Sequence, residues 1–282
     1  GVGWLVMGLT PVYAVLILGM GIVSLASSIW HLPAMAALSR HFPHGKGISL
    51  SLHGVGGNIG DVVASPFTGL LLLYFGWRGI ISVYAVIPIL LGFVAFWSFR
   101  DIGGKTEEAD ESIKIDLQIQ RAKTLLKNPI LLGIAFVESL REMALVPFDT
   151  FIPIYLDEVG MGPLSRGLHL GLLVCIGTVT TPIMGYLSDR ISRKMVLVPV
   201  LLSLCGLTLL LVPFGTGIPL TLIIAGIGMF LYTDQPILTA AALDMVEQDV
   251  AATTLGIVSF YRFVLSGASP LIAGYLYHTL DS

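Results

Sequence analysis

The sequence predicts an all-α membrane protein made of helical bundles, with about eight transmembrane helices. Hydrophobic residues make up 55% of the 282 residues, whereas Asp, Glu, Lys and Arg together make up only 12%. A soluble domain carries about 25% charged residues. The apolar residues also fall in runs of about 20, the length that a helix needs to cross hydrocarbon. These observations exclude a water-soluble fold, and a net charge of −3 gives no sign of a nucleic-acid partner.

Each apolar run is predicted to be a helix, because only a helix or a closed barrel satisfies the backbone polar groups within lipid. Residues 1–9 are interpreted as the tail of a preceding span, and both ends of the chain look like cuts through a longer protein. The eight predicted spans are 12–37, 48–74, 80–98, 129–155, 166–187, 195–213, 217–243 and 252–277.

The orientation follows from the basic residues of the connections, since cytoplasmic loops carry an excess of Lys and Arg. One set of alternate loops holds eleven such residues, and the other holds only Arg78 and Arg166. The first set is therefore predicted to face the cytoplasm. It includes the longest polar stretch, residues 100–128, which we interpret as a cytoplasmic linker between two bundles, 1–99 and 129–282.

An internal repeat supports this division, and such repeats are common in secondary transporters. Ser65-Pro66 matches Ser269-Pro270 at an offset of 204 residues. Trp30-His31-Leu32-Pro33 likewise resembles Thr233-Asp234-Gln235-Pro236 at an offset of 203. The two nearly equal offsets predict that the segments around His31 and Asp234 occupy equivalent places in two related halves. Between them, Gly56 and Gly60 form a G-x-x-x-G pattern that favours close helix packing.

Charged residues inside the predicted spans are the candidate functional residues, because an ionisable group in the bilayer is costly and persists where it has a role or a partner. Glu138, Arg141 and Glu142 have i, i+3, i+4 spacing and lie on one face of a helix. Arg141 either neutralises a neighbouring carboxylate or binds a solute. Asp234 has no basic residue at i±3 or i±4, and this favours a functional role. No H-E-x-x-H, G-x-S-x-G or G-x-x-x-x-G-K-[ST] motif is present, so neither an enzyme, a bound metal nor a cofactor is predicted.

The loop after the fifth span reads Gly-Tyr-Leu-Ser-Asp-Arg-Ile-Ser-Arg-Lys over residues 185–194, and it resembles a signature loop of the major facilitator superfamily. Ser192 replaces the second glycine of that signature. A carboxylate at a helix end can pair with basic residues in one conformation and release them in another. The resemblance therefore implies a conformational-switch loop, whose residues are Gly185, Asp189, Arg190, Arg193 and Lys194.

The resemblance also implies twelve spans in the complete protein, of which the first two, most of the third and the twelfth are absent here. The spans that line the central cavity of this family would include those carrying His31, the Arg141 triplet and Asp234. His31 and Asp234 are then expected to face each other across the cavity. Asp61 and Arg262 lie on spans that flank it.

Together these residues predict transport of a small solute by alternating access, coupled to protons, with an organic anion as the favoured substrate. Arg141 would bind the anionic group, and Asp234, Glu142 or Glu138 would carry the proton. A proton-coupled exporter of toxic compounds is the alternative, and a receptor or scaffold without transport is a distant one. The protein is expected to be a monomer in the cell inner membrane.

Overall fold

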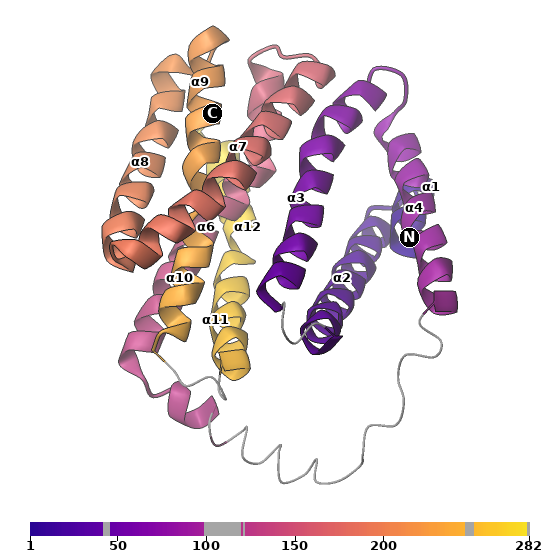
Figure 1. Cartoon of the computed structure of the whole chain (residues 1–282). Coiled ribbons are helices and arrows are strands. Elements are labelled where there is room, and N and C mark those ends of the chain that lie inside the picture. The colour runs from indigo at the N-terminus through magenta and orange to yellow at the C-terminus, as the bar shows by residue number, and fades with distance from the viewer. Residues whose placement is uncertain (42–45, 99–119, 121, 246–250, 281–282) are drawn as a thin grey trace. The chain divides into compact units, whose positions relative to one another are not determined.

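The computed structural model describes residues 1–41, 46–98, 120, 122–245 and 251–280, without most side chains between residues 28 and 55. Helices form nearly all of this described part (Figure 1). In chain order they are α1 (Val2–Leu9), α2 (Tyr13–His41), α3 (Lys46–Leu71), α4 (Trp77–Ser98), α6 (Pro129–Glu158), α7 (Pro163–Arg190), α8 (Arg193–Phe214), α9 (Gly217–Leu231), α10 (Asp234–Leu243), α11 (Ala251–Ser266) and α12 (Ser269–Leu280).

The prediction of an all-α membrane fold is confirmed. In the described part, five helices or helix pairs are long and apolar enough to cross a membrane: Trp77–Ser98, Pro163–Arg190, Arg193–Phe214, Gly217–Ala242 and Thr253–Leu280. The 30 residues of α6 extend over about 45 Å, more than the hydrocarbon thickness, although this helix also carries the charged triplet.

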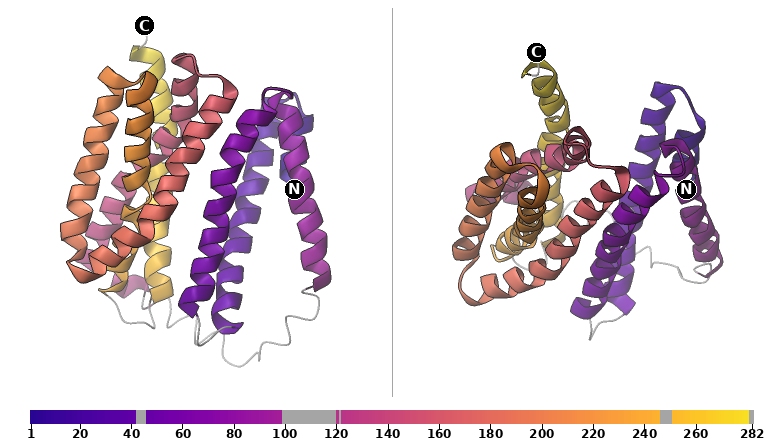
Figure 2. Two further views of the ribbon diagram at one scale, coloured as in Figure 1. Left: turned by 45° about the horizontal axis from the view of Figure 1, so that its top comes forward. Right: turned by 90° about the horizontal axis from the view of Figure 1, so that it is seen from above.

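The chain divides into two compact units. The first holds residues 1–107 together with 163–171, and within it α1 packs against α2 and α4. The second holds residues 108–162 and 172–282. There α6 packs against α10, α11 and α12. In addition, α8 packs against α9 and α10, and these three helices are orange in Figure 2. The predicted division into the bundles 1–99 and 129–282 stays a prediction.

Close helix packing in the first unit involves a different glycine from those in the G-x-x-x-G pattern. A Cβ atom added to Gly69 of α3 would lie 2.4 Å from the carbonyl oxygen of Pro163 at the start of α7. One added to Gly167 would lie 2.5 Å from the carbonyl oxygen of Ser65. Gly56 and Gly60, in contrast, have no atom of the described residues within 4 Å of an added Cβ.

Two spans of the second unit are broken a few residues before a proline, although α6, α7 and α8 continue through the prolines within them. Proline lacks an N–H and its ring clashes with the carbonyl four residues earlier. Four residues before Pro236 is Tyr232, which lies in the break between α9 and α10. The Thr233 hydroxyl donates to the carbonyl of Phe230 at 2.8 Å and so satisfies one exposed acceptor at the end of α9. A similar hydrogen bond lies at the end of α11, where the Ser269 hydroxyl donates to the carbonyl of Ser266 at 2.6 Å. Ser266, the last residue of α11, lies four residues before Pro270.

The Gly69 contact predicts the stability of two matched variants of the full-length protein. We expect Gly69→Ala to destabilise by about 1–3 kcal/mol, because the added methyl group overpacks against backbone. Gly92→Ala on α4 meets open space and should be neutral or stabilising by up to about 1 kcal/mol. Thermal unfolding in detergent compares them, and equal midpoints would contradict the close approach.

Candidate functional site

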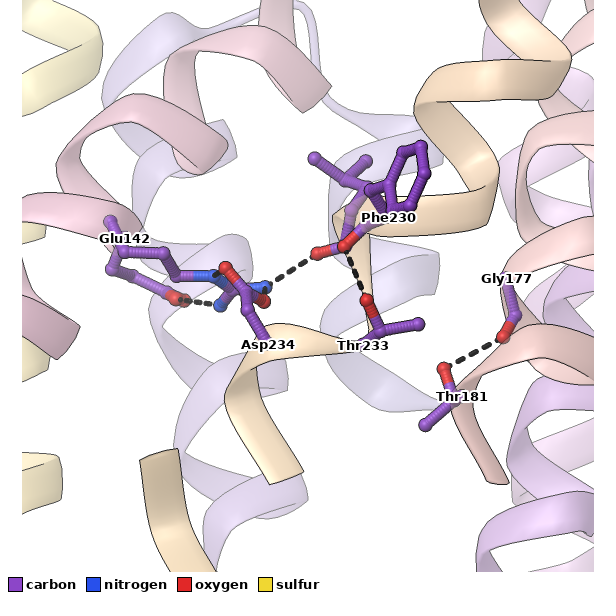
Figure 3. A network of polar contacts seen from close by, with 8 residues as sticks. Glu142, Gly177, Thr181, Phe230, Thr233 and Asp234 are labelled. Carbon is purple, nitrogen blue, oxygen red and sulfur yellow. Dashed lines mark hydrogen bonds and ion pairs between the residues drawn. The ribbon is translucent and has the colours of Figure 1, made fainter. Parts of the chain in front are cut away.

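A buried arginine, Arg141 of α6, makes the central polar contacts of the second unit. Its Nε donates to Asp234 Oδ2 at 2.9 Å, its Nη1 donates to Glu142 Oε2 at 2.7 Å, and its Nη2 donates to the carbonyl oxygen of Leu231 at 2.7 Å. Asp234 Oδ1 also lies 2.9 Å from Nη2, which makes an ion pair without the direction of a hydrogen bond. Figure 3 shows Glu142 and Asp234 within this network of polar contacts.

Burial distinguishes the members of this site. The Arg141 side chain is 5% exposed and that of Asp234 is 0% exposed, whereas that of Glu142 is 13% exposed. A buried charge is tolerated when it is paired and hydrogen-bonded. All three nitrogen atoms of Arg141 have such partners, and Glu142 is the partner through which water has most access.

The break in the span explains why Arg141 finds these partners. In a continuous helix the Leu231 carbonyl would accept from the backbone N–H four residues later, but at the end of α9 it needs another donor. Asp234 is the first residue of α10, where the helix dipole favours negative charge. The arginine therefore joins the negative end of one helix to the carboxylate that begins the next.

A third carboxylate and a second arginine complete this group. Glu138 lies one turn before Arg141 and is 2% exposed, and its Oε1 has no hydrogen-bond partner among the described residues. The charges of Arg262 on α11, Arg141, Glu142 and Asp234 all act on it. The Arg141 cluster, as we name these five residues, thus holds three carboxylates and two guanidinium groups.

The loop between α7 and α8 forms a separate ionic network. Arg193 is ion-paired with Asp189, donates to the Ser188 hydroxyl at 3.0 Å, and donates through Nε to Asp244 Oδ2 at 3.1 Å. Asp244 directly follows α10, so this network joins the loop to the end of that helix.

The remaining residues of the loop have simpler roles in the structure. Ser192, which departs from the family signature, caps α8 by accepting a hydrogen bond from the Met195 N–H at 3.1 Å. The Arg190 guanidinium lies 4.8 Å from the centre of the Tyr186 ring. Gly185 accepts a hydrogen bond from the Ser188 hydroxyl, and Lys194 is exposed.

The structure thus brings together Glu138, Arg141, Glu142, Asp234 and Arg262, which the sequence presented on three separate spans. The side chain of His31 lies outside the described residues, so its pairing with Asp234 stays a prediction. Asp61 lies on α3 in the first unit and is exposed.

Sequence reasoning missed two partners. Asp244 was not singled out, although an acidic residue at the end of a span beside a basic loop is a signal for it. No residue type in the sequence identifies the Leu231 carbonyl as a partner, because this carbonyl belongs to the backbone. Only the proline at position 236 indicates that the helix breaks near it.

Comparisons with known proteins agree with one another. A family model described as Major Facilitator Superfamily matches residues 1–270. Probable nitrate transporters named NarT from Staphylococcus aureus strains JH9 and Newman are each 29% identical over 206 residues, which cover 69% of this chain and 50% of theirs. The chain spans about half the length of these relatives.

Among solved structures, a bacterial homologue of the human lysosomal transporter Spinster, in an inward-facing and occupied conformation, has a similar fold. The TM-score is 0.76 at 16% sequence identity, and the match covers 98% of this chain and 64% of that one.

The Arg141 contacts predict a large and specific loss of stability. Arg141→Gln leaves the buried Asp234 carboxylate without a cation and should destabilise the full-length protein by about 3–5 kcal/mol. Adding Asp234→Asn removes that charge and should restore part of the lost stability, because the stability effects of substitutions at residues in contact are not additive. Thermal unfolding in detergent measures both, with exposed Lys127→Gln as the control. A double variant no more stable than Arg141→Gln would argue against the pair.

Proposed function

Since this chain belongs to the Major Facilitator Superfamily, we propose that it transports a small anion by alternating access, together with protons. The proposal places the protein as a monomer in the cell membrane, with the linker 100–128 in the cytoplasm. In this family arrangement α6 and the pair α9–α10 line the central cavity, as the resemblance of the sequence implies.

The observation that carries the proposal is the set of acceptors already on Arg141. Three of its five N–H groups donate to Asp234, Glu142 and the Leu231 carbonyl, and both oxygens of Asp234 lie within 2.9 Å of the guanidinium nitrogens, so a solute anion competes with carboxylates already paired with this arginine. An ionised Asp234 would compete with the solute and repel it. A protonated Asp234 loses its charge and releases the Arg141 donors. Binding of a proton and binding of an anion therefore favour each other, as symport requires.

The geometry of arginine favours a small oxoanion. A guanidinium group presents parallel N–H donors that match the paired oxygens of a carboxylate or of another planar oxoanion. The relatives from Staphylococcus aureus are named probable nitrate transporters, and nitrate has this planar arrangement of oxygens. We propose nitrate and small organic carboxylates as the solutes to test first.

The Arg193 network is proposed as the conformational switch of the second unit. It holds a loop carboxylate and the end of α10 on one guanidinium group. Because α10 begins with Asp234, a movement of α10 that accompanies solute binding would also strain or break the Arg193–Asp244 contact. The switch and the anion site are thereby connected through one ten-residue helix.

Asp234→Asn tests the proposed coupling in the full-length protein reconstituted in vesicles. The amide cannot gain or lose a proton, so accumulation of labelled nitrate or carboxylate driven by a proton gradient should be abolished. Exchange of internal for external solute needs no net proton movement and should be retained. Asp157→Asn, at an exposed position of the same helix as Arg141, is the matched control.

Unchanged accumulation by Asp234→Asn would overturn the assigned role. Gradient-driven exit of cationic compounds, with no uptake of anions by the unmodified protein, would instead favour the exporter.

Arg193→Gln tests the switch. Partly exposed ion pairs contribute about 0.2–1 kcal/mol each, so loss of two should change the conformational equilibrium by about two- to thirtyfold. We expect the maximal exchange rate to change with little change in the solute concentration for half-maximal rate. Arg190→Gln is the control, because it removes a neighbouring charge whose contact described above is with the Tyr186 ring. If Arg190→Gln changed the maximal exchange rate as much as Arg193→Gln, the proposed switch would be contradicted.

A further inference from the structure

Glu138 is the member of the Arg141 cluster that the proposed mechanism leaves unexplained. It is 2% exposed, and its Oε1 has no hydrogen-bond partner among the described residues. A buried carboxylate without a donor is costly to keep ionised, because it has lost water and gained no hydrogen bond in return. Glu142 and Asp234 add repulsion between like charges.

Arg141 already donates to Asp234, Glu142 and the Leu231 carbonyl, and none of its hydrogen bonds among the described residues reaches Glu138 Oε1. The other cation that acts on Glu138 is Arg262. Its Nε is buried and also has no partner in the described part of the chain. Arg262 lies on α11, which packs closely along α6. Glu138 Oε1 and Arg262 Nε thus each lack a hydrogen-bond partner among the described residues, on two helices that pack together. The Arg262 guanidinium instead lies 4.6 Å from the centre of the neighbouring Phe263 ring.

The charges of the cluster indicate how this arrangement is stabilised. Three carboxylates and two guanidinium groups leave one negative charge uncompensated, and one proton makes the cluster neutral. Asp234 and Glu142 each have a direct ion pair with Arg141, whereas Glu138 has no ion pair among the described residues. A single proton on Glu138 therefore neutralises the one carboxylate of the cluster that has no ion pair among the described residues.

We propose that Glu138 holds the coupling proton in the conformation described here, and that Arg262 is the cation with which it pairs once that proton leaves. The proposal rests on the proposed function and deepens it. When an anion approaches, the O–H bond at Glu138 breaks and an O–H bond forms at Asp234, directly or through water. The Glu138 carboxylate then accepts a hydrogen bond from Arg262 Nε–H, and Asp234, now neutral, leaves Arg141 to the anion.

This sequence assigns different tasks to two carboxylates of one site. The protonation of Asp234 controls whether Arg141 can bind an anion. Glu138 holds the proton while the ionised Asp234 is paired with Arg141. Arg262 acts as a positioning residue, since it contacts neither the solute nor the moving proton and keeps its own protons throughout.

Infrared difference spectroscopy tests the location of the proton without any transport assay. Purified full-length protein without solute is titrated with acid and base, and the C=O stretch of a protonated carboxyl group is followed. We expect the band in the unmodified protein and its loss in Glu138→Gln. It should remain in Glu142→Gln and in the exposed-site variant Asp157→Asn. A band that survives Glu138→Gln, or that disappears in Glu142→Gln, overturns the proposal even if the protein proves to be a proton-coupled anion transporter.

Arg262→Gln tests the second half of the proposal. Without its cation, Glu138 should retain the proton, so gradient-driven accumulation should fall by about tenfold or more, the effect of about 1.4 kcal/mol. Solute exchange should fall far less, and Arg262→Lys should recover accumulation. The double variant Glu138→Gln/Arg262→Gln should be no worse than Glu138→Gln alone. Equal losses of accumulation and exchange, or additive losses in the double variant, would mean that Arg262 only supports the packing of α11.

Discussion

The second unit depends on one interaction, the three-way contact of Arg141 across the break between α9 and α10. A broken helix inside a bilayer exposes carbonyl groups that water cannot reach, so each needs a donor from the protein. Thr233 supplies one and Arg141 supplies another. The arginine is in turn tolerated because Asp234 and Glu142 compensate its charge. The irregular backbone and the buried ions therefore stabilise each other, and neither would persist alone.

The same interaction limits how the site can work. In the proposed mechanism, an anion that binds this guanidinium group competes with the carboxylates already paired with it, and in a low dielectric a carboxylate is released most readily by neutralising it. In this proposal, anion binding and protonation are two aspects of one exchange of partners, and the excess of carboxylates over arginines in the Arg141 cluster is the reason that a proton takes part.

Hydrophobic run length predicted the helices well, since the cost of burying backbone in lipid constrains spans so strongly. The i, i+3, i+4 spacing likewise placed Glu138, Arg141 and Glu142 on one face of α6, and the signature loop indicated the ion pair of Asp189 with Arg193. The partners of Arg141 were beyond sequence reasoning. The Leu231 carbonyl belongs to the backbone, and the approach of α10 to α6 depends on packing between distant segments.

The internal repeat shows why the site forms where it does. Pro33 and Pro66 lie within helices that continue through them, whereas their counterparts Pro236 and Pro270 coincide with breaks. The segments that match in the predicted repeat thus share positions of proline but not the local backbone. At the first of these breaks the repeat also places Asp234 where the other half has His31, so an acidic residue sits at a helix start that favours negative charge. A broken helix, a carboxylate at its start and an arginine on the facing helix are all required for the exchange of partners, and in the described residues they come together in the second unit.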